Sequence, residues 1–498
     1  MNRKKILLRI WIIAVILLGW WRFWHFVVQD VPLGYDPGIY REYFLKYSEL
    51  NFLSDTSSLP DRMQRVFPPF LWILAAVIQK FWILSLDRSV SWWVGIQSAL
   101  ISMALYFLLS WKDKRRAVVV ALLSWISFVQ YQVFWRNYMK QLTGMFFLLI
   151  TLGLWLRGKI WLSFPLVFAL SIVHRPWLLV IWILWVFRVL SQWVQMLQHK
   201  LKYWVRWIQQ KSLIGELMLV AFVVLLLHPS IYPWFLQEQI ASLFKWFLNS
   251  IDTPNFNDSF KSGWTFLTTW DLIKTNLHVL LLSLIGFVMS IKDKGISLLK
   301  IWWIFGTVRV FAQFSFYQRM MGYADLFWLV FSGLALLKIR DRKKWVWVLV
   351  WGLFFLGHAS IFSYRVNRTW RPIMVAQELE FFKTLPSILP DDAIVMNTDS
   401  LYSAWLNGRS ERPTISPWLF DLDERNKSEW EENRWTSDGS TKCEALQNTY
   451  WNTYQDLYIW QWSKQYPNDF TWWDCFEVFQ ISDDMKIPWT MYRVRLGE

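Results

Sequence analysis

The chain has 498 residues, of which 55% are apolar and 18% charged, and its mean hydropathy is positive. A soluble protein of this length would carry more charge, so these values exclude an ordinary soluble enzyme. The formal net charge of +15 would point to nucleic acid only if the basic residues gathered on one soluble face, and they lie instead between long apolar runs. The composition predicts a protein that crosses the membrane several times and has no nucleic-acid partner.

Apolar runs, counted in chain order, predict about eleven membrane helices in an all-α polytopic bundle. They lie near 6–28, 89–110, 117–134, 144–156, 161–174, 177–193, 212–228, 275–291, 298–315, 322–338 and 344–361. The first run lacks a small-residue cleavage site and is expected to be retained. With the N-terminus in the cytoplasm, all the basic clusters between runs face inward, as the positive-inside rule requires. We therefore expect a plasma (inner) membrane protein with an extracytoplasmic C-terminal domain.

One apolar segment does not fit this count. It runs from Phe67-Pro68-Pro69-Phe70 to about Leu86. If it crossed the membrane, every later basic loop would lie on the outside. We expect it to form a re-entrant or interfacial helix within the first external loop, residues 29–88.

The chain is predicted to divide into a membrane domain, 1–362, and an external soluble domain, 363–498. In the latter, an amphipathic run at 375–385 precedes a short buried strand at 393–396, which indicates a small α/β or α+β domain. The two cysteines of the chain, Cys443 and Cys475, both fall here. An external location favours a disulfide between them, and two buried thiols are the alternative.

The stretch Gly34-Tyr35-Asp36-Pro37-Gly38-Ile39-Tyr40 follows the first apolar run. Pro37 suits the first position of a helix, and Asp36 suits the N-cap before it. Apolar residues recur behind it at helical spacing, which predicts a helix lying on the membrane surface. Asp36 is therefore either a helix cap or a carboxylate that takes a proton at the mouth of the bundle. A second tier of site candidates consists of Asp30, Tyr40 and Glu42.

Basic residues are predicted at the outer ends of several membrane helices. These are Arg136 and Lys140, His174 and Arg175 at a helix break, and Arg319. Such residues either bind phosphate, which arginine contacts through two parallel hydrogen bonds, or anchor their helices at the interface. Arg309 lies inside the predicted span 298–315 and is a further candidate, because a charge in the membrane is costly unless it faces the bundle interior or a partner.

The order of these parts resembles the GT-C superfamily of polyprenyl-phosphate-sugar glycosyltransferases, which includes protein O-mannosyltransferases and aminoarabinose transferases of lipid A. The resemblance covers about the first 360 residues and rests on the 34–40 motif, the helix after Pro37 and Phe67-Pro68-Pro69-Phe70. It implies that Asp36 is the essential acidic residue of the first external loop. Many members carry a second acidic residue in the external turn between the third and fourth helices, discussed as a metal ligand or as a residue that binds the acceptor. That turn, 135–141, has no carboxylate here, so we predict no metal and no other cofactor.

The resemblance implies an enzyme that moves a hexosyl or pentosyl group from a polyprenyl-phosphate donor to an extracytoplasmic glycan, lipid or protein. Asp36 would be the general base, and the basic residues at the outer ends of the helices would hold the phosphate of the donor, whose lipid tail lies among the membrane lipids. Attack opposite the phosphate would invert the anomeric configuration. A transporter or flippase is one alternative, although the 34–40 motif is not repeated in the second half of the chain. A non-catalytic envelope assembly or adhesion protein, with Asp36 only a cap, is another.

Overall fold

The structure is a computed structural model that describes a defined set of residues. These are 86–135, 139–174, 269–293, 297–312, 317–342, 344–368, 376–397, 457–462, 475–481 and 489–494, with shorter pieces at 20, 24, 27–28, 38, 40–41, 181, 185–186, 218–219, 221, 374, 405–406, 408–412 and 414–415. The chain separates into two compact units. The helical unit comprises Met1–Phe26, Thr56–Leu71 and Trp93–Trp370, and the sheet unit comprises Val27–Asp55, Trp72–Trp92 and Arg371–Glu498.

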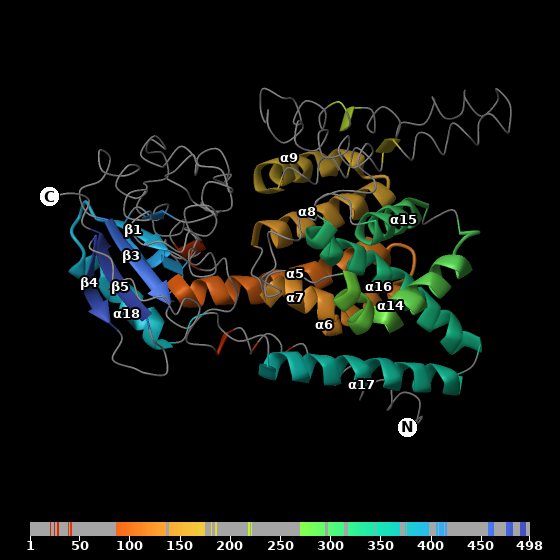
Figure 1. Ribbon diagram of the computed structural model, residues 1–498. Helices are drawn as coiled ribbons and strands as arrows, with labels where there is room; N and C mark the ends of the chain where they lie inside the picture. The colour runs from red at the N-terminus through yellow and green to blue at the C-terminus, as the bar shows by residue number, and fades with distance from the viewer. Residues whose placement is uncertain are drawn as a thin grey trace. The chain divides into compact units, whose positions relative to one another are not determined.

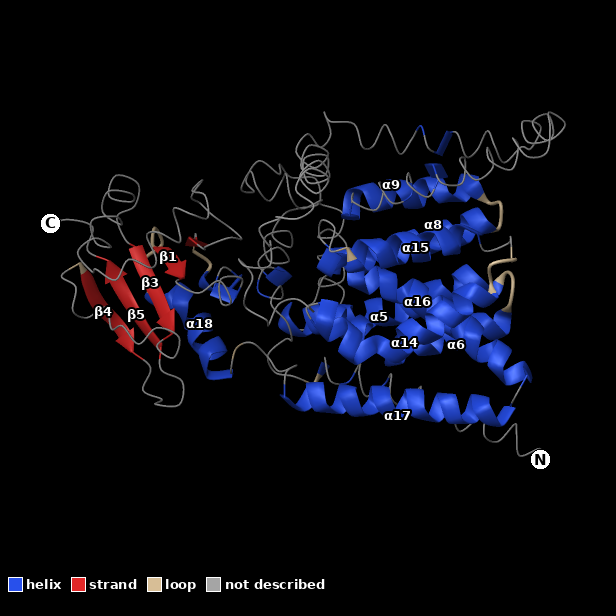
Figure 2. Ribbon diagram, turned by 45° about the vertical axis from the view of Figure 1, so that its right-hand side comes forward, coloured by secondary structure: helices blue, strands red, loops and turns tan. Residues whose placement is uncertain are grey.

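Helices make up most of the described part of the helical unit (Figures 1 and 2). They are α5 (Leu86–Ser110), α6 (Lys114–Ile126), α7 (Phe128–Trp135), α8 (Met139–Leu156), η2 (Ile160–Leu162), α9 (Ser163–His174), α14 (Thr269–Met289), α15 (Ser297–Phe311), α16 (Tyr317–Arg342) and α17 (Lys344–Arg368). Every predicted span in the described ranges corresponds to helix. The spans predicted at 6–28, 177–193 and 212–228, and the segment 67–86, lie outside the described residues, so the total of eleven stays a prediction.

Four of these helices are long and apolar enough to cross a membrane. They contain the windows Val90–Ser110, Thr269–Met289, Met321–Asp341 and Lys344–Ile361. The window in α16 is 83% buried, whereas that in α17 is 6% buried. The exposed side of α17 carries large apolar side chains such as Trp345 and Leu353. In an integral multi-pass protein, such a face is suited to lipid, and a buried helix such as α16 belongs to the interior of the bundle.

Helix α16 is the central helix of the described helical unit and packs against α6, α7, α14, α15 and α17. Glycines allow close approach around it. A Cβ added to Gly286 of α14 would lie 1.9 Å from the carbonyl oxygen of Phe331, and one added to Gly333 would lie 2.6 Å from Val120. Small residues at helix contacts are typical of membrane bundles, where van der Waals packing drives association.

The basic loops of the helical unit lie together at one end. Lys112, after α5, forms an ion pair with Asp293, after α14. Lys338 of α16 donates a 2.6 Å hydrogen bond to the carbonyl of Met289, and Arg157, after α8, donates to the carbonyl of Phe107. Loops that precede or follow these helices must therefore share one side of the membrane. This arrangement agrees with the positive-inside pattern of the sequence.

The sheet unit contains a five-stranded mixed sheet in the order β2-β1-β3-β5-β4. Strand β1 (Ile394–Asn397) runs parallel to both β2 (Thr414–Ile415) and β3 (Leu457–Trp462). Strand β5 (Trp489–Val494) is antiparallel to β3 and to β4 (Phe476–Ile481). Both parallel pairs involve β1, the strand predicted from 393–396.

Helix α18 (Ala376–Ile388) packs on this sheet and corresponds to the amphipathic run predicted at 375–385. Its buried residues Leu379, Phe382 and Leu385 recur every three positions, which places them on one face of the helix. The ring of Phe382 meets that of Trp460 in β3 edge-on at 5.3 Å. Each such side chain stabilises the unit by about 1.5–3 kcal/mol on burial.

Candidate functional site

The helix predicted after Pro37 is present where the structure describes it. Gly38, Tyr40 and Arg41 are all helical. Tyr40, a second-tier candidate, is buried, with 4% of its surface exposed. Asp36 itself and the other two acidic candidates, Asp30 and Glu42, lie outside the described residues.

The residues that follow Asp36 contact a distant segment of the same unit. Arg41 donates a 2.5 Å hydrogen bond from Nη1 to the carbonyl of Gly408, although 367 residues separate them. Its Nη2 lies 3.8 Å from Oε1 of Glu411. Gly408 also lies directly against Gly38, since a Cβ added to Gly408 would be 1.8 Å from the carbonyl oxygen of Gly38. The motif is therefore packed against residues 408–411.

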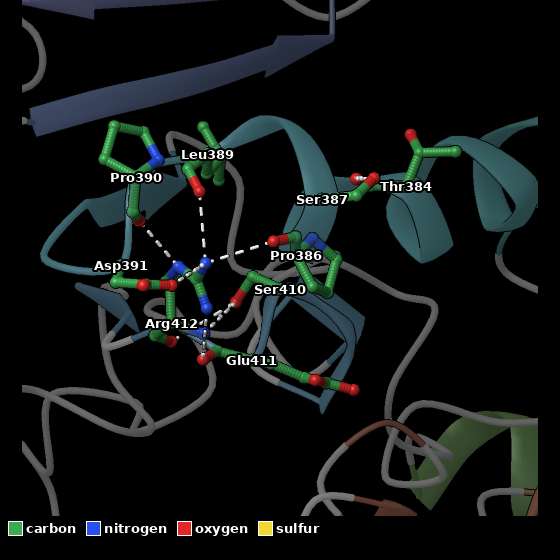
Figure 3. A network of polar contacts seen from close by, with 9 residues as sticks. All are labelled: Thr384, Pro386, Ser387, Leu389, Pro390, Asp391, Ser410, Glu411 and Arg412. Carbon is green, nitrogen blue, oxygen red and sulfur yellow. Dashed lines mark hydrogen bonds and ion pairs between the residues drawn. The ribbon is translucent and has the colours of Figure 1, made fainter.

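Segment 408–412 is itself held against the end of α18 by Arg412 (Figure 3). The guanidinium group of Arg412 donates to the carbonyls of Pro390 at 2.7 Å and of Pro386 and Leu389 at 3.1 Å, and to Oδ1 of Asp391 at 2.9 Å. Carbonyls at a helix C-terminus have no partner within the helix, and a cationic side chain satisfies them well. In Figure 3 the side chain of Glu411 extends away from this network.

In the helical unit, α7, α8 and α16 meet at the end opposite the basic loops. Gln130 of α7 donates a 2.6 Å hydrogen bond to the carbonyl of Gly322 in α16. Tyr323 of α16 donates a 3.0 Å hydrogen bond to the carbonyl of Gln141 in α8. The last turn of α7 and the first turns of α8 and α16 are therefore neighbours.

Helices α9 and α15 end on the same side. The short turn through η2 returns the chain along α8, so that α9 ends where α8 begins. Helix α15 runs antiparallel to α16, as Trp302 meets Phe327 at 5.0 Å and Gly306 faces Ala324 further along. One end of the helical unit thus receives the C-termini of α7, α9 and α15 and the N-termini of α8 and α16.

Four of the basic site candidates belong to four of these helix ends. Lys140 lies in the first turn of α8, His174 is the last residue of α9, and Arg319 lies in the first turn of α16. Only the helical positions of these three are described. Arg309, in the last turn of α15, is half-buried, with its guanidinium carbon 5.9 Å from the ring centre of Phe305. Arg136 and Arg175 lie outside the described residues.

Sequence reasoning missed a buried polar cluster beside this end. Asp325 of α16 is fully buried, and its Oδ2 accepts hydrogen bonds from Ser127 Oγ at 2.7 Å and Gln130 Nε2 at 2.9 Å. An ionisable residue inside a span is a signal that a membrane sequence offers directly, because such a residue is costly there. Asp325 lies inside the predicted span 322–338 and carries the same signal as Arg309 in the span 298–315.

The predicted span 117–134 is two helices, and the break lies at Ser127. Its Oγ accepts the backbone N–H of Gln130 at 3.2 Å, which is the geometry of an N-cap. Ser127-Phe128-Val129-Gln130 has the spacing of a capping box, so the sequence contained the signal for a new helix start. Because the apolar run continues through Ser127, the hydropathy pattern predicted one helix where the structure has two.

Two further expectations concern cysteines and metals. Cys475, before β4, is disulfide-bonded, and Cys443, the other cysteine of the chain, lies outside the described residues. Among the residues that the structure describes, no group of three His, Cys, Asp or Glu side chains could hold a metal ion. Because the acidic residues of the first loop are not in that set, metal-independent transfer stays a prediction.

No protein-family model and no curated protein sequence matches the chain. The similarity to known proteins is one of three-dimensional structure: the chain shares its fold with solved structures of the GT-C membrane glycosyltransferases ArnT and AglB.

Two of the similar structures are of ArnT from Cupriavidus metallidurans, at 11% sequence identity. The apo form has a TM-score of 0.57 over 98% of this chain and 99% of that chain. The form bound to undecaprenyl phosphate has a TM-score of 0.56 over 97% and 98%. A third is the archaeal oligosaccharyltransferase AglB from Archaeoglobus fulgidus in complex with an inhibitory peptide and a dolichol-phosphate, with a TM-score of 0.54, 13% identity, and coverage of 90% of this chain and 69% of that chain. At sequence identities this low, the structural similarity shows a shared fold and does not transfer the roles of individual residues. Those roles are argued from the geometry of this chain.

Proposed function

We propose that this protein is a membrane glycosyltransferase that moves a hexosyl or pentosyl group from a polyprenyl-phosphate donor to an extracytoplasmic glycan, lipid or protein. The observation that carries the proposal is the fold shared, over nearly the whole length of both chains, with a structure bound to undecaprenyl phosphate. A second support is the position of the helix that follows Asp36, which contacts Gly408 within the sheet unit through Gly38 and Arg41.

In the proposed reaction, a hydroxyl oxygen of the acceptor attacks the anomeric carbon of the donor. The bond from that carbon to the phosphate oxygen breaks, and polyprenyl phosphate leaves with the electron pair. Asp36 takes the proton of the hydroxyl. Attack from the face opposite the phosphate inverts the anomeric configuration. A carboxylate is a weak base in water, but a desolvated position raises its proton affinity, and proximity to the acceptor supplies much of the rate.

The negative charge that develops on the leaving phosphate needs fixed positive charge nearby. The helix ends that carry Lys140, His174, Arg319 and Arg309 lie at one end of the helical unit, which supports a phosphate site there. Arg136 and Arg175 directly follow or adjoin two of those ends in the sequence. Arg319 is preferred as a phosphate ligand over Lys140 and His174, because arginine stays charged and can contact two phosphate oxygens at once.

The experiment uses the purified full chain with undecaprenyl-phosphate-linked sugars and isolated cell-envelope acceptors. Unmodified protein should transfer label from one class of donor. Asp36→Asn should abolish transfer with normal expression and folding, because Asn caps a helix about as well as Asp but cannot take the proton. If Asp36→Asn transfers sugar as well as the unmodified protein, Asp36 is a helix cap and not the base. If the unmodified protein transfers sugar from no lipid-linked donor, a transporter or an assembly protein is favoured.

A further inference from the structure

Two parts of the sheet unit that are far apart in sequence meet backbone to backbone. Gly38 and Arg41 come from the helix that follows Asp36 in the sequence, and Gly408 and Glu411 come from the connection between β1 and β2. The carbonyl of Gly38 fills the space that a side chain at residue 408 would need. Any residue other than glycine at 408 would therefore displace Gly38 and the helix that follows Asp36.

The conformation of Glu411 is unusual. Its φ is 53°, and among the described residues no other non-glycine has a positive φ. Glycine would relieve this backbone strain, since the left-handed region is unfavourable for any residue with a Cβ. The chain instead places a carboxylate here, and that carboxylate faces Arg41. A strained residue at a contact is a reason to look for a functional role there.

The segment is also held by hydrogen bonds to the end of α18. Arg412, next to Glu411, donates to three carbonyls at the end of α18 and to Asp391. Ser410 is fully buried, and its Oγ accepts the backbone N–H of Arg412 at 3.3 Å. The contacts of Gly408 and Glu411 with the first loop are thus fixed to the folded core of the soluble domain.

We propose that residues 408–412 are a docking element of the C-terminal domain that sets the position of the Asp36 loop, with Arg41, Gly408 and Glu411 as positioning residues for sugar transfer. This inference rests on the proposed function and gives the soluble domain a role in it. Asp36 lies two residues before Gly38, so a shift of Gly38 moves the base relative to the acceptor. A displacement of about 1 Å can reduce a rate about 100-fold.

The two contacts of Arg41 differ in strength. The bond to the Gly408 carbonyl is short, and the side chain of Arg41 is only 15% exposed. The ion pair is longer, at 3.8 Å, and Glu411 is 44% exposed. Exposed ion pairs contribute little, so most of the positioning effect should come from the hydrogen bond and the glycine contact.

The test combines steady-state transfer kinetics with hydrogen exchange of the peptide 34–42 in the full-length protein. Gly408→Ala should raise exchange in that peptide and lower kcat about 10- to 100-fold, while KM for the lipid-linked donor stays nearly constant. Arg41→Ala should act in the same direction, and Arg41→Lys, which keeps a donor and the charge, should retain most of the activity. Glu411→Gln should lower kcat only about twofold.

Glu411→Gly separates positioning from stability. It removes backbone strain and should leave the melting temperature unchanged or higher, yet it should lower kcat at least as much as Glu411→Gln. The matched control is Gly352→Ala in α17, where an added Cβ meets nothing within 4 Å. That variant should match the unmodified protein in exchange, kcat and KM.

A folded Gly408→Ala protein with unchanged exchange in 34–42 would overturn the inference. Raised exchange with unchanged kcat, in a protein that Asp36→Asn inactivates, would overturn it as well. If Asp36→Asn transfers sugar normally, the assignment of the base fails, and exchange in 34–42 still decides whether the loop is docked. If Gly408→Ala does not fold, the comparison of Arg41→Ala with Arg41→Lys decides the same question.

Discussion

Ser127 donates a 2.7 Å hydrogen bond to the carboxylate of Asp325, which lies 198 residues later in the chain. Ser127 marks the break between α6 and α7, and Asp325 lies two turns into the central helix α16. Gln130 adds a second bond to the same oxygen and a third to the Gly322 carbonyl. These bonds fix α7 to α16 close to the first turn of α16, which carries Arg319.

We predict that Asp325→Ala costs about 3 kcal/mol of stability, because it leaves the buried donors of Ser127 and Gln130 without their acceptor. Asp325→Asn keeps an acceptor oxygen for both and should cost less than about 1 kcal/mol. Thermal melting of the two variants in the same detergent measures the difference. Equal melting temperatures for the two would show that the hydrogen bonds to Asp325 do not hold these helices together.

The contact of Gly286 with Phe331 predicts a packing defect. A Cβ at 286 would lie 1.9 Å from a backbone oxygen that cannot rotate away, so α14 must move from α16. We expect Gly286→Ala to destabilise the protein by about 1–3 kcal/mol. Gly352→Ala makes the same chemical change in open space and should be neutral or slightly stabilising. A melting temperature of Gly286→Ala equal to that of Gly352→Ala would contradict this packing.

Arg319 provides a test of the phosphate site. Loss of a charged hydrogen bond is worth about 1.5–3 kcal/mol, so Arg319→Ala should raise KM for the lipid-linked donor about 10- to 100-fold. Arg319→Lys keeps the charge but cannot make two parallel hydrogen bonds, so its KM should lie between those of the unmodified protein and Arg319→Ala. Arg340 offers a matched control, because it lies near the other end of α16 and pairs with Asp341 at 2.7 Å. If Arg319→Ala and Arg340→Ala have the same KM, Arg319 does not bind the phosphate.

Chelation tests the expectation that transfer needs no metal. Incubation of the purified protein with EDTA, followed by assay in chelator, should leave the rate unchanged, because in the proposed mechanism Asp36 supplies the base and fixed cations supply the positive charge. Loss of activity that Mg²⁺ or Mn²⁺ restores would mean that a bound divalent cation takes part. In that case, Asp30 and Glu42 would be the first residues to substitute in a search for the metal ligands.

Arg412 should matter for the stability of the sheet unit. Arg412→Lys cannot reach the carbonyls of Pro386, Leu389 and Pro390 together, and we expect a loss of about 2 kcal/mol. Limited proteolysis of the domain after residue 371 at increasing temperature measures this. Lys383, whose partner Glu380 lies on the exposed side of α18, provides the control. Lys383→Ala should behave as the unmodified protein does, and equal protease resistance of both variants would show that Arg412 is dispensable as a cap.

Most of the helical architecture could be predicted because its cause is local. Runs of apolar residues long enough to span hydrocarbon form helices in lipid, since no other conformation satisfies their backbone groups. The predicted helices at 89–110, 275–291, 298–315, 322–338 and 344–361 match α5, α14, α15, α16 and α17 for this reason. The period of three to four residues in 375–385 likewise predicted the buried face of α18.

The tertiary structure alone decided which residues far apart in the chain contact each other. No sequence pattern pairs Arg41 with Gly408, or Ser127 with Asp325, because hydrogen bonds between distant segments depend on how helices and strands pack. The sequence by itself determined that the chain is a membrane bundle followed by a small soluble domain, since hydropathy and periodicity act within a few turns. The gathering of helix ends at one end of the helical unit, and the contacts of Gly38 and Arg41 with Gly408 and Glu411, follow only from packing, which acts between segments that sequence order does not relate.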